Sequence, residues 1–302
     1  MNGFVFYDEN ANGVLDPSEV VRLPSVSVNV GGAAATTVAG GRFSLSVPDG
    51  SQTAQATGLP PYFKAAAAVA VGVPASGDVA VPAVLPIGTR AKANVYLAFG
   101  DSITAGDGSG DGNGYLSYLG DSLKSYWGRA DLVKDGLSGS KSVVGQARIP
   151  GSLARYRPAY ALILYGTNDW NEAECKSAFP CYTVDALRSM VQDTRSGGAF
   201  PILGTIPPVN PAWADRSPDE RNDWVSRMND LVRAMAKQEG VPVAEIHGAF
   251  LKQPSLPPLF SDDKHPSDAG YRLIAQAFFA AITTPVAGAA GQAFGFEAPG
   301  GF

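Results

Sequence analysis

The spacing of hydrophobic residues along the chain changes near residue 90. Before this point, short stretches such as residues 26–30 and 43–47 alternate apolar and polar positions, and Gly or Pro turn residues follow each of them. A period of two is typical of strands with one buried face. We therefore expect residues 1–90 to form a small all-β sandwich domain.

Beyond residue 90, short apolar stretches alternate with amphipathic helices. Apolar residues recur at intervals of three and four within residues 224–235 and 271–282, as expected for helices with one buried face. Buried parallel strands are indicated for residues 95–99, 161–165, 202–206 and 241–246. This order predicts a flavodoxin-like α/β domain over residues 91–284, with a parallel sheet in the middle of three α/β/α layers. The Gly-, Ala- and Pro-rich residues 285–302 are expected to form a tail or linker.

The composition limits which kinds of binding partner and which compartment we expect for this protein. The net charge of −5 and the pI near 5.1 arise without long runs of one sign, which disfavours nucleic acid and anionic lipid as partners. No run of 18 or more apolar residues is present to span a membrane. The first residues lack a signal-peptide pattern, so we expect a trimmed form of a secreted, extracellular bacterial protein, and a monomer.

The two cysteines, Cys175 and Cys181, lie six residues apart in a polar stretch. A small disulfide ring can close over this separation if the loop curls back, and two free thiols are the alternative. A disulfide would indicate an oxidising compartment. A zinc site is disfavoured because tetrahedral zinc needs four ligands and no further cysteine or histidine accompanies this pair.

A serine follows the first predicted strand of the α/β domain, in a Gly-Asp-Ser turn that ends at Ser102. Such a turn is common on protein surfaces and would mean little alone. Serine attacks an ester only when an imidazole accepts its proton and a carboxylate orients the imidazole. Asp262 and His265 supply both groups just before a predicted helix. His247, the other histidine, has no acid three positions earlier and is expected to be structural.

Attack on an ester also requires hydrogen-bond donors for the oxygen that becomes negatively charged. Two further turns offer such donors at the ends of predicted strands. Residues 135–139 include Gly136 and Gly139, and a glycine lets its backbone N–H approach a ligand closely. Residues 166–169 include Asn168, whose side-chain amide can point to the same edge of the sheet. Neither turn would be informative alone.

Taken in order, the serine, glycine and asparagine turns and the Asp-x-x-His pair resemble the four blocks of the SGNH (GDSL-like) hydrolase superfamily, over about residues 94–283. The resemblance implies that Ser102 is the nucleophile and that the Asp-x-x-His pair completes a catalytic triad. It further implies an oxyanion hole made of the Ser102 and Gly139 N–H groups and the Asn168 amide. Gly136 is the other candidate for the glycine of this hole.

By this resemblance we expect a secreted serine esterase that hydrolyses carboxylic esters through an acyl-enzyme and needs no cofactor for catalysis. Small-molecule esters with short acyl or acetyl groups and acetylated polysaccharide are the expected substrates. Asp101 and Asp169 adjoin the motif and are expected to hold loops through hydrogen bonds. An acyltransferase or a thioesterase would use the same triad. A surface adhesion or carbohydrate-binding protein with a catalytically idle hydrolase-like domain is the alternative from another class.

Residues 8–19 match the calcium-loop pattern D-x-[DN]-x-[DN]-G-x5-E at every specified position. Oxygen ligands at alternate positions, a glycine at the sharp turn and a final carboxylate suit a hard cation. The pattern predicts a structural Ca²⁺ ion bound by Asp8, Asn10, Asn12, Val14, Asp16 and Glu19. A hairpin loop without metal is the alternative. Together with residues 37–50, the loop resembles Cna-B-like β-sandwich repeats of bacterial surface proteins, which implies a role in spacing, stabilisation or docking.

Overall fold

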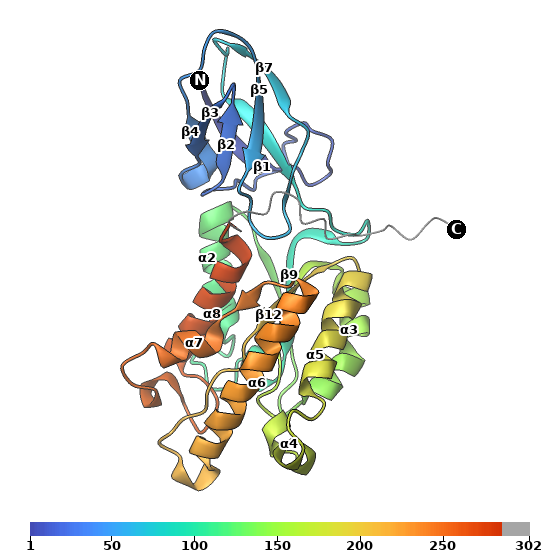
Figure 1. Cartoon of the computed structure of the whole chain (residues 1–302), viewed down its shortest axis with the longest axis vertical. Helices are drawn as coiled ribbons and strands as arrows, with labels where there is room; N and C mark the ends of the chain where they lie inside the picture. The colour runs from blue at the N-terminus through green and yellow to red at the C-terminus, as the bar shows by residue number, and fades with distance from the viewer. Residues whose placement is uncertain (286–302) are drawn as a thin grey trace, which may run out of the picture.

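Two small sheets make up the N-terminal region of the computed structural model, which describes residues 1–285 (Figure 1). One sheet has the strand order β4 (Arg42–Ser44), β1 (Asn2–Tyr7), β8 (Val79–Val84), β6 (Lys64–Ala65), and the other has the order β3 (Ala33–Thr36), β2 (Ser27–Val30), β5 (Gly50–Thr57), β7 (Val69–Val73). In β2 the alternating pattern separates two faces, since Val28 and Val30 are fully buried and Asn29 is exposed. Apart from Pro285, the predicted tail lies outside the described residues.

Five parallel strands form the central sheet of the second region, in the order β10 (Asp131–Gly136), β9 (Lys92–Gly100), β11 (Pro158–Leu164), β12 (Phe200–Gly204), β13 (Val243–Ala244). One face is covered by α2 (Tyr115–Trp127), α7 (Ile246–Leu251) and α8 (Asp268–Thr283), and the other by α3 (Ser142–Tyr156), α5 (Thr183–Ser196) and α6 (Pro218–Glu239) (Figure 1). Alternate residues of β9 reach the two faces, with Tyr96 and Ala98 on the first and Leu97 and Phe99 on the second. The predicted three-layer α/β architecture is confirmed.

The last strand of this sheet is much shorter than the pattern predicted. A strand was expected over residues 241–246, but β13 spans only Val243–Ala244, because Pro242 has no N–H to donate and α7 begins at Ile246. Single 3-10 turns connect other elements, namely η1 (Ala39–Gly41), η3 (Ala214–Arg216) and η4 (Pro257–Leu259). Within the described part of the chain, no helix is both long and apolar enough to cross a membrane.

Aromatic side chains join the N-terminal region to the parallel sheet. Tyr7 contacts Phe63, whose ring centroid lies 6.0 Å from that of Trp127. Trp127 in turn meets Tyr96, which stacks on Tyr160 at a centroid distance of 5.0 Å. All five rings are buried. The hydrophobic core therefore continues across the boundary predicted at residue 90, and the N-terminal region packs directly on the α/β region.

Hydrogen bonds across this junction lie at the edge where the parallel strands begin. The Tyr62 hydroxyl donates to the Pro201 carbonyl at 2.6 Å, next to the first residue of β12. The side-chain amide of Asn94, near the start of β9, donates to the Glu9 carboxylate at 2.6 Å. The carboxyl ends of the strands point the other way, so the N-terminal region and the edge that bears Ser102 are at opposite ends of the sheet (Figure 1).

Candidate active site

Ser102 lies where β9 passes directly into a short helix. The strand ends at Gly100, and α1 (Ser102–Ala105) begins two residues later. Gly100 leaves no room for a side chain, because a Cβ atom there would lie 2.1 Å from the Thr104 hydroxyl. The Asp101 carboxylate caps the helix by accepting the second backbone N–H of α1 at 3.0 Å. This rigid turn presents the Ser102 hydroxyl at the carboxyl edge of the sheet.

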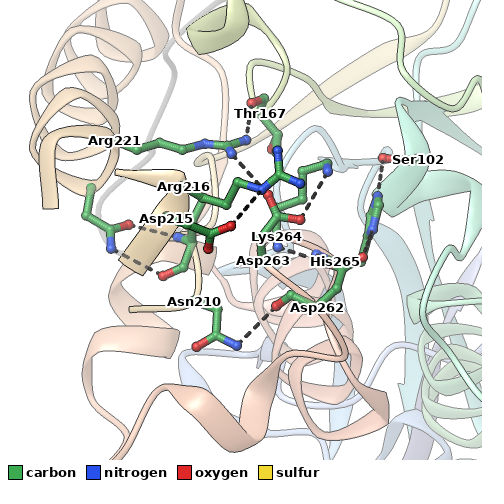
Figure 2. Close-up of polar contacts among 12 residues, drawn as sticks. Ser102, Thr167, Asn210, Asp215, Arg216, Arg221, Asp262, Asp263, Lys264 and His265 are labelled. Atoms are coloured by element: carbon green, nitrogen blue, oxygen red, sulfur yellow. Dashed lines mark hydrogen bonds and ion pairs between the residues drawn. The ribbon is translucent and has the colours of Figure 1, made fainter. Parts of the chain in front are cut away.

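A continuous hydrogen-bond chain joins Ser102, His265 and Asp262 (Figure 2). His265 Nε2 lies 2.9 Å from Ser102 Oγ, and His265 Nδ1 lies 2.6 Å from Asp262 Oδ2. Burial acts to raise the pKa of Asp262, but the backbone N–H groups of His265 and Lys264 and the His265 ring outweigh it and hold that pKa below its usual value. An ionised Asp262 accepts the Nδ1–H and leaves Nε2 free to accept the serine proton. His247 takes no part in this chain; it is buried, and burial lowers the pKa of its ring.

Two side chains that the sequence analysis did not identify hold the loop before His265. The Asn210 amide donates to the Asp262 carbonyl at 3.0 Å, across 52 positions of the chain. The buried Arg221 donates from Nη2 to the Thr167 carbonyl at 2.9 Å and lies 3.6 Å from the Asp263 carboxylate (Figure 2). Arg221 thus links the loop of the asparagine turn to the loop of the histidine. Contacts between such distant positions have no local sequence signal.

The three predicted turns meet at one edge of the sheet. Asn168 Nδ2 donates to the Ser140 carbonyl at 3.0 Å and lies 3.5 Å from an Asp101 carboxylate oxygen. Gly139 is exposed with φ +75°, and a Cβ atom there would meet nothing within 4 Å. Gly136 is instead paired within β10, where a Cβ atom would lie 2.1 Å from the backbone of α1. The backbone at Gly139 is therefore open to a ligand, whereas Gly136 serves close packing.

Comparison with known families agrees with this arrangement. The sequence profile of the GDSL-like lipase/acylhydrolase family matches residues 98–273, more than half of the 302 residues. The chain belongs to this family. All four sequence blocks and the hydrogen-bond chain from Ser102 to Asp262 lie within the matched residues. The expectation of a carboxylic ester hydrolase is thereby confirmed at the level of the GDSL family.

Individual relatives match over shorter stretches. The chain is 30% identical over 116 residues to the thioesterase 1/protease 1/lysophospholipase L1 of Escherichia coli K12, covering 38% of this chain and 52% of that protein. It is 32% identical over 114 residues to the esterase TesA of Pseudomonas aeruginosa, covering 38% and 55%. The chain thus spans about half the length of these relatives. The acetylxylan esterase Axe2 of Geobacillus stearothermophilus shares the fold, with a TM-score of 0.53, 24% identity and coverage of 65% of this chain and 96% of that one.

Asp169, in the asparagine block of the GDSL family, joins three elements behind the site. Its side chain is fully buried. One carboxylate oxygen accepts the Ser142 backbone N–H at 2.9 Å, and the other accepts the Ser142 and Thr183 hydroxyls at 2.6 and 2.8 Å. Ser142 begins α3 and Thr183 begins α5, so one carboxylate fixes the asparagine turn against the first residues of two helices.

The predicted disulfide between Cys175 and Cys181 is present and follows the GDSL asparagine block. It closes the loop that contains α4 (Ala173–Ser177), after the turn η2 (Asp169–Asn171). The Trp224 indole of α6 donates to the Cys175 carbonyl at 3.0 Å, and Trp170 packs edge-to-face on the same indole. The disulfide loop is therefore anchored on α6 as well as closed on itself.

The loop at residues 8–19 holds itself together with hydrogen bonds. Asp8 and Glu19 are each 2% exposed. The Asp8 carboxylate accepts the Asn12 and Gly13 N–H groups, and the Glu19 carboxylate accepts those of Glu9 and Asp16, at 2.7–3.1 Å. Among the described residues, no group of three or more His, Cys, Asp or Glu side chains is placed to hold a metal ion. The structure therefore does not support the predicted calcium site, which stays a prediction from the sequence pattern.

Proposed function

We propose that this protein is a secreted serine esterase that hydrolyses carboxylic esters through an acyl-enzyme on Ser102. The observation that carries the proposal is the unbroken chain of hydrogen bonds from Ser102 through His265 to an ionised Asp262, at 2.9 and 2.6 Å. Such a chain supplies the base and the orienting acid that a serine nucleophile requires. The disulfide supports a secreted location, since disulfides persist in oxidising compartments.

The geometry supports a two-step reaction. Ser102 Oγ attacks the ester carbonyl while its proton passes to His265 Nε2, and the Ser102 and Gly139 N–H groups with the Asn168 amide bind the resulting oxyanion. The bond to the alcohol then breaks, and the alcohol leaves with the proton from His265. A water molecule next gives its proton to the same nitrogen and attacks the acyl-enzyme. The Ser102–acyl bond breaks, the acid is released, and Ser102 recovers its proton.

Short acyl and acetyl groups are the proposed acyl part of the substrate, on small molecules or on polysaccharide. The support comes from a relative of the same fold that is described as an acetylxylan esterase. Thioester hydrolysis is the second candidate, because the Escherichia coli relative is named a thioesterase. Both reactions use the same residues, so acetyl-thiocholine and p-nitrophenyl acetate compared at equal concentration separate the two preferences.

Hydrolysis of p-nitrophenyl acetate, butyrate and octanoate by wild type and Ser102→Ala tests the proposal. We expect the serine variant to lose at least about a thousandfold in kcat. Ser122→Ala is the matched control, because Ser122 is an exposed serine of α2 whose hydroxyl donates to the Tyr118 carbonyl of the same helix. Equal turnover by wild type and Ser102→Ala would refute the assignment. Absence of turnover by wild type on every ester would favour the carbohydrate-binding alternative.

A further inference from the structure

A polar pocket of about 630 Å³ adjoins the two loops that carry Asn168 and His265. Trp170, two positions after Asn168, forms part of its wall, and so do Asp263 and Lys264, which directly precede His265. The rest of the lining comes from Asn171 and Lys176, from the turn before α6 and from the first residues of that helix. Two of the loops that form the walls of this pocket therefore also carry residues of the proposed active site.

Cationic side chains outnumber acidic ones in the lining. Lys176, Arg216, Arg221 and Lys264 line the pocket together with three carboxylates, although the whole chain has a net charge of −5. One of these carboxylates, that of Asp263, is shared between Lys264 at 3.3 Å and Arg221 at 3.6 Å. The lining therefore has one positive charge in excess.

Arg221 is the buried cation of this lining. It is 4% exposed, and burial lowers the pKa of its guanidinium despite the nearby Asp263. Its Nη2 donates to a neutral carbonyl, that of Thr167, and the Asp263 carboxylate at 3.6 Å is beyond hydrogen-bond distance. Its Nε has no hydrogen-bond partner in the described part of the chain. A buried cation with so few acceptors leaves a positive potential that favours an incoming anion.

Arg216 provides an accessible cation at the same pocket. Its side chain is 63% exposed, and its closest carboxylate, that of Asp215, is 3.9 Å away. Figure 2 shows Arg216 and Arg221 on the same side of the Ser102–His265 pair, with Asp263 and Lys264 between them and the histidine. A planar guanidinium binds a carboxylate through two parallel hydrogen bonds, which suits Arg216 to a carboxylate ligand.

We propose that this pocket binds a carboxylate on the alcohol part of the ester, as on a uronic acid residue next to an acylated sugar. This inference rests on the proposed esterase function and specifies its substrate class. The single excess positive charge of the lining is neutralised by one carboxylate, whereas a bound phosphate dianion would leave the pocket with a net negative charge. The half-buried indole of Trp170 adds one apolar wall for the sugar ring.

The test compares acetylated xylo-oligosaccharides with and without a glucuronic acid substituent. We expect wild type to prefer the acidic substrate in kcat/KM, and Arg216→Gln to lower the ratio of acidic to neutral kcat/KM about tenfold. Arg227→Gln is the matched control, because Arg227 is an exposed arginine of α6 that pairs with Asp223 and does not line the pocket. Added salt should reduce the wild-type ratio, since screening weakens exposed charge pairs.

The outcomes separate this inference from the proposed function. An equal ratio in wild type and Arg216→Gln overturns the carboxylate pocket. Inhibition of p-nitrophenyl acetate hydrolysis by inorganic phosphate, with none by free glucuronate, also overturns it. If turnover depends on Ser102 but shows no preference for the acidic substrate, the proposed esterase function stands and only the proposed carboxylate pocket is rejected. No turnover of any ester by wild type removes the esterase function itself.

Discussion

Asp101 makes the stability of this protein depend on pH. Its carboxyl group is 1% exposed between β9 and α1. Burial raises the pKa of Asp101 to about 7; the Ile103 N–H opposes this rise, and the nearby Asp169 and Asp107 carboxylates add to it. At mildly acidic pH, the folded protein therefore keeps a proton on a side chain that would be ionised in water.

The sign and size of the effect follow from this proton. An unfolded chain releases the Asp101 proton near pH 4, while the folded chain holds it up to about pH 7. Because the unfolded state binds fewer protons in this window, the free energy of unfolding falls as pH rises from 4 to 7. A shift of about three pKa units corresponds to about 4 kcal/mol when complete. This loss of unfolding free energy is absent when the pH is below both pKa values. It is complete when the pH is above the pKa of Asp101 in the folded protein.

Asp101→Asn removes this titration with little change in shape, because the Asn oxygen can still accept the Ile103 N–H that caps α1. The measurement is urea unfolding of wild type and variant from pH 4.5 to 8. We expect the variant to gain about 3 kcal/mol relative to wild type across this range, as the shared titrations of other groups cancel in the difference. A difference between the two proteins that stays constant with pH would refute the reasoning.

Four further predictions concern catalysis, packing and metal binding. Asp262→Asn should lower kcat about ten-thousandfold with little change in KM, because an amide favours the wrong histidine tautomer; an effect on KM alone would contradict this. Asp169→Asn should lower kcat for p-nitrophenyl acetate by a factor about ten times larger than the factor by which it changes KM, since the asparagine turn loses an acceptor. An equal kcat in wild type and variant would rule out a positioning role for Asp169. Trp127→Ala, which truncates a buried ring at the junction of the two regions, should cost about 3–5 kcal/mol in urea unfolding, whereas the exposed Trp213→Ala should cost under about 1 kcal/mol. Calcium in place of EDTA should raise the melting temperature if residues 8–19 bind the ion only when folded, and an unchanged value rejects the calcium site.

The sequence predicted the parts of the site that depend on local chemistry. A glycine was needed before Asp101 because the turn from β9 to α1 has no space for a Cβ atom. The three-residue spacing of Asp262 and His265 lets one carboxylate accept both the backbone N–H and the ring N–H of the same histidine. The six-residue spacing of the cysteines likewise allowed a local ring. These features lie within a few positions of one another, so a pattern of residue types is enough to indicate them.

The layers of the fold were predictable for a similar reason. Burial on one face of a strand or helix imposes a period of two or of about three and a half, and that period is visible in a single sequence. It located β9, β11 and β12 but overestimated β13, where Pro242 and the start of α7 limit the strand to two residues. The strand order could not be obtained in this way, because pairing depends on positions far apart in the chain.

Only the tertiary structure decided how the regions and loops are joined. The sequence predicted a domain boundary near residue 90, and the structure shows that Phe63 contacts Trp127 across this boundary within one buried aromatic cluster. Arg221 reaches Thr167 across 54 positions to link the asparagine and histidine loops, and it lines the pocket beside them. Periodicity and motif spacing indicate which residues are buried and which have side chains suited to catalysis or binding. These patterns do not indicate which distant residues come into contact, because those contacts form only when the chain folds. In this protein the long-range contacts join the two regions in one hydrophobic core and place the charged side chains beside the site.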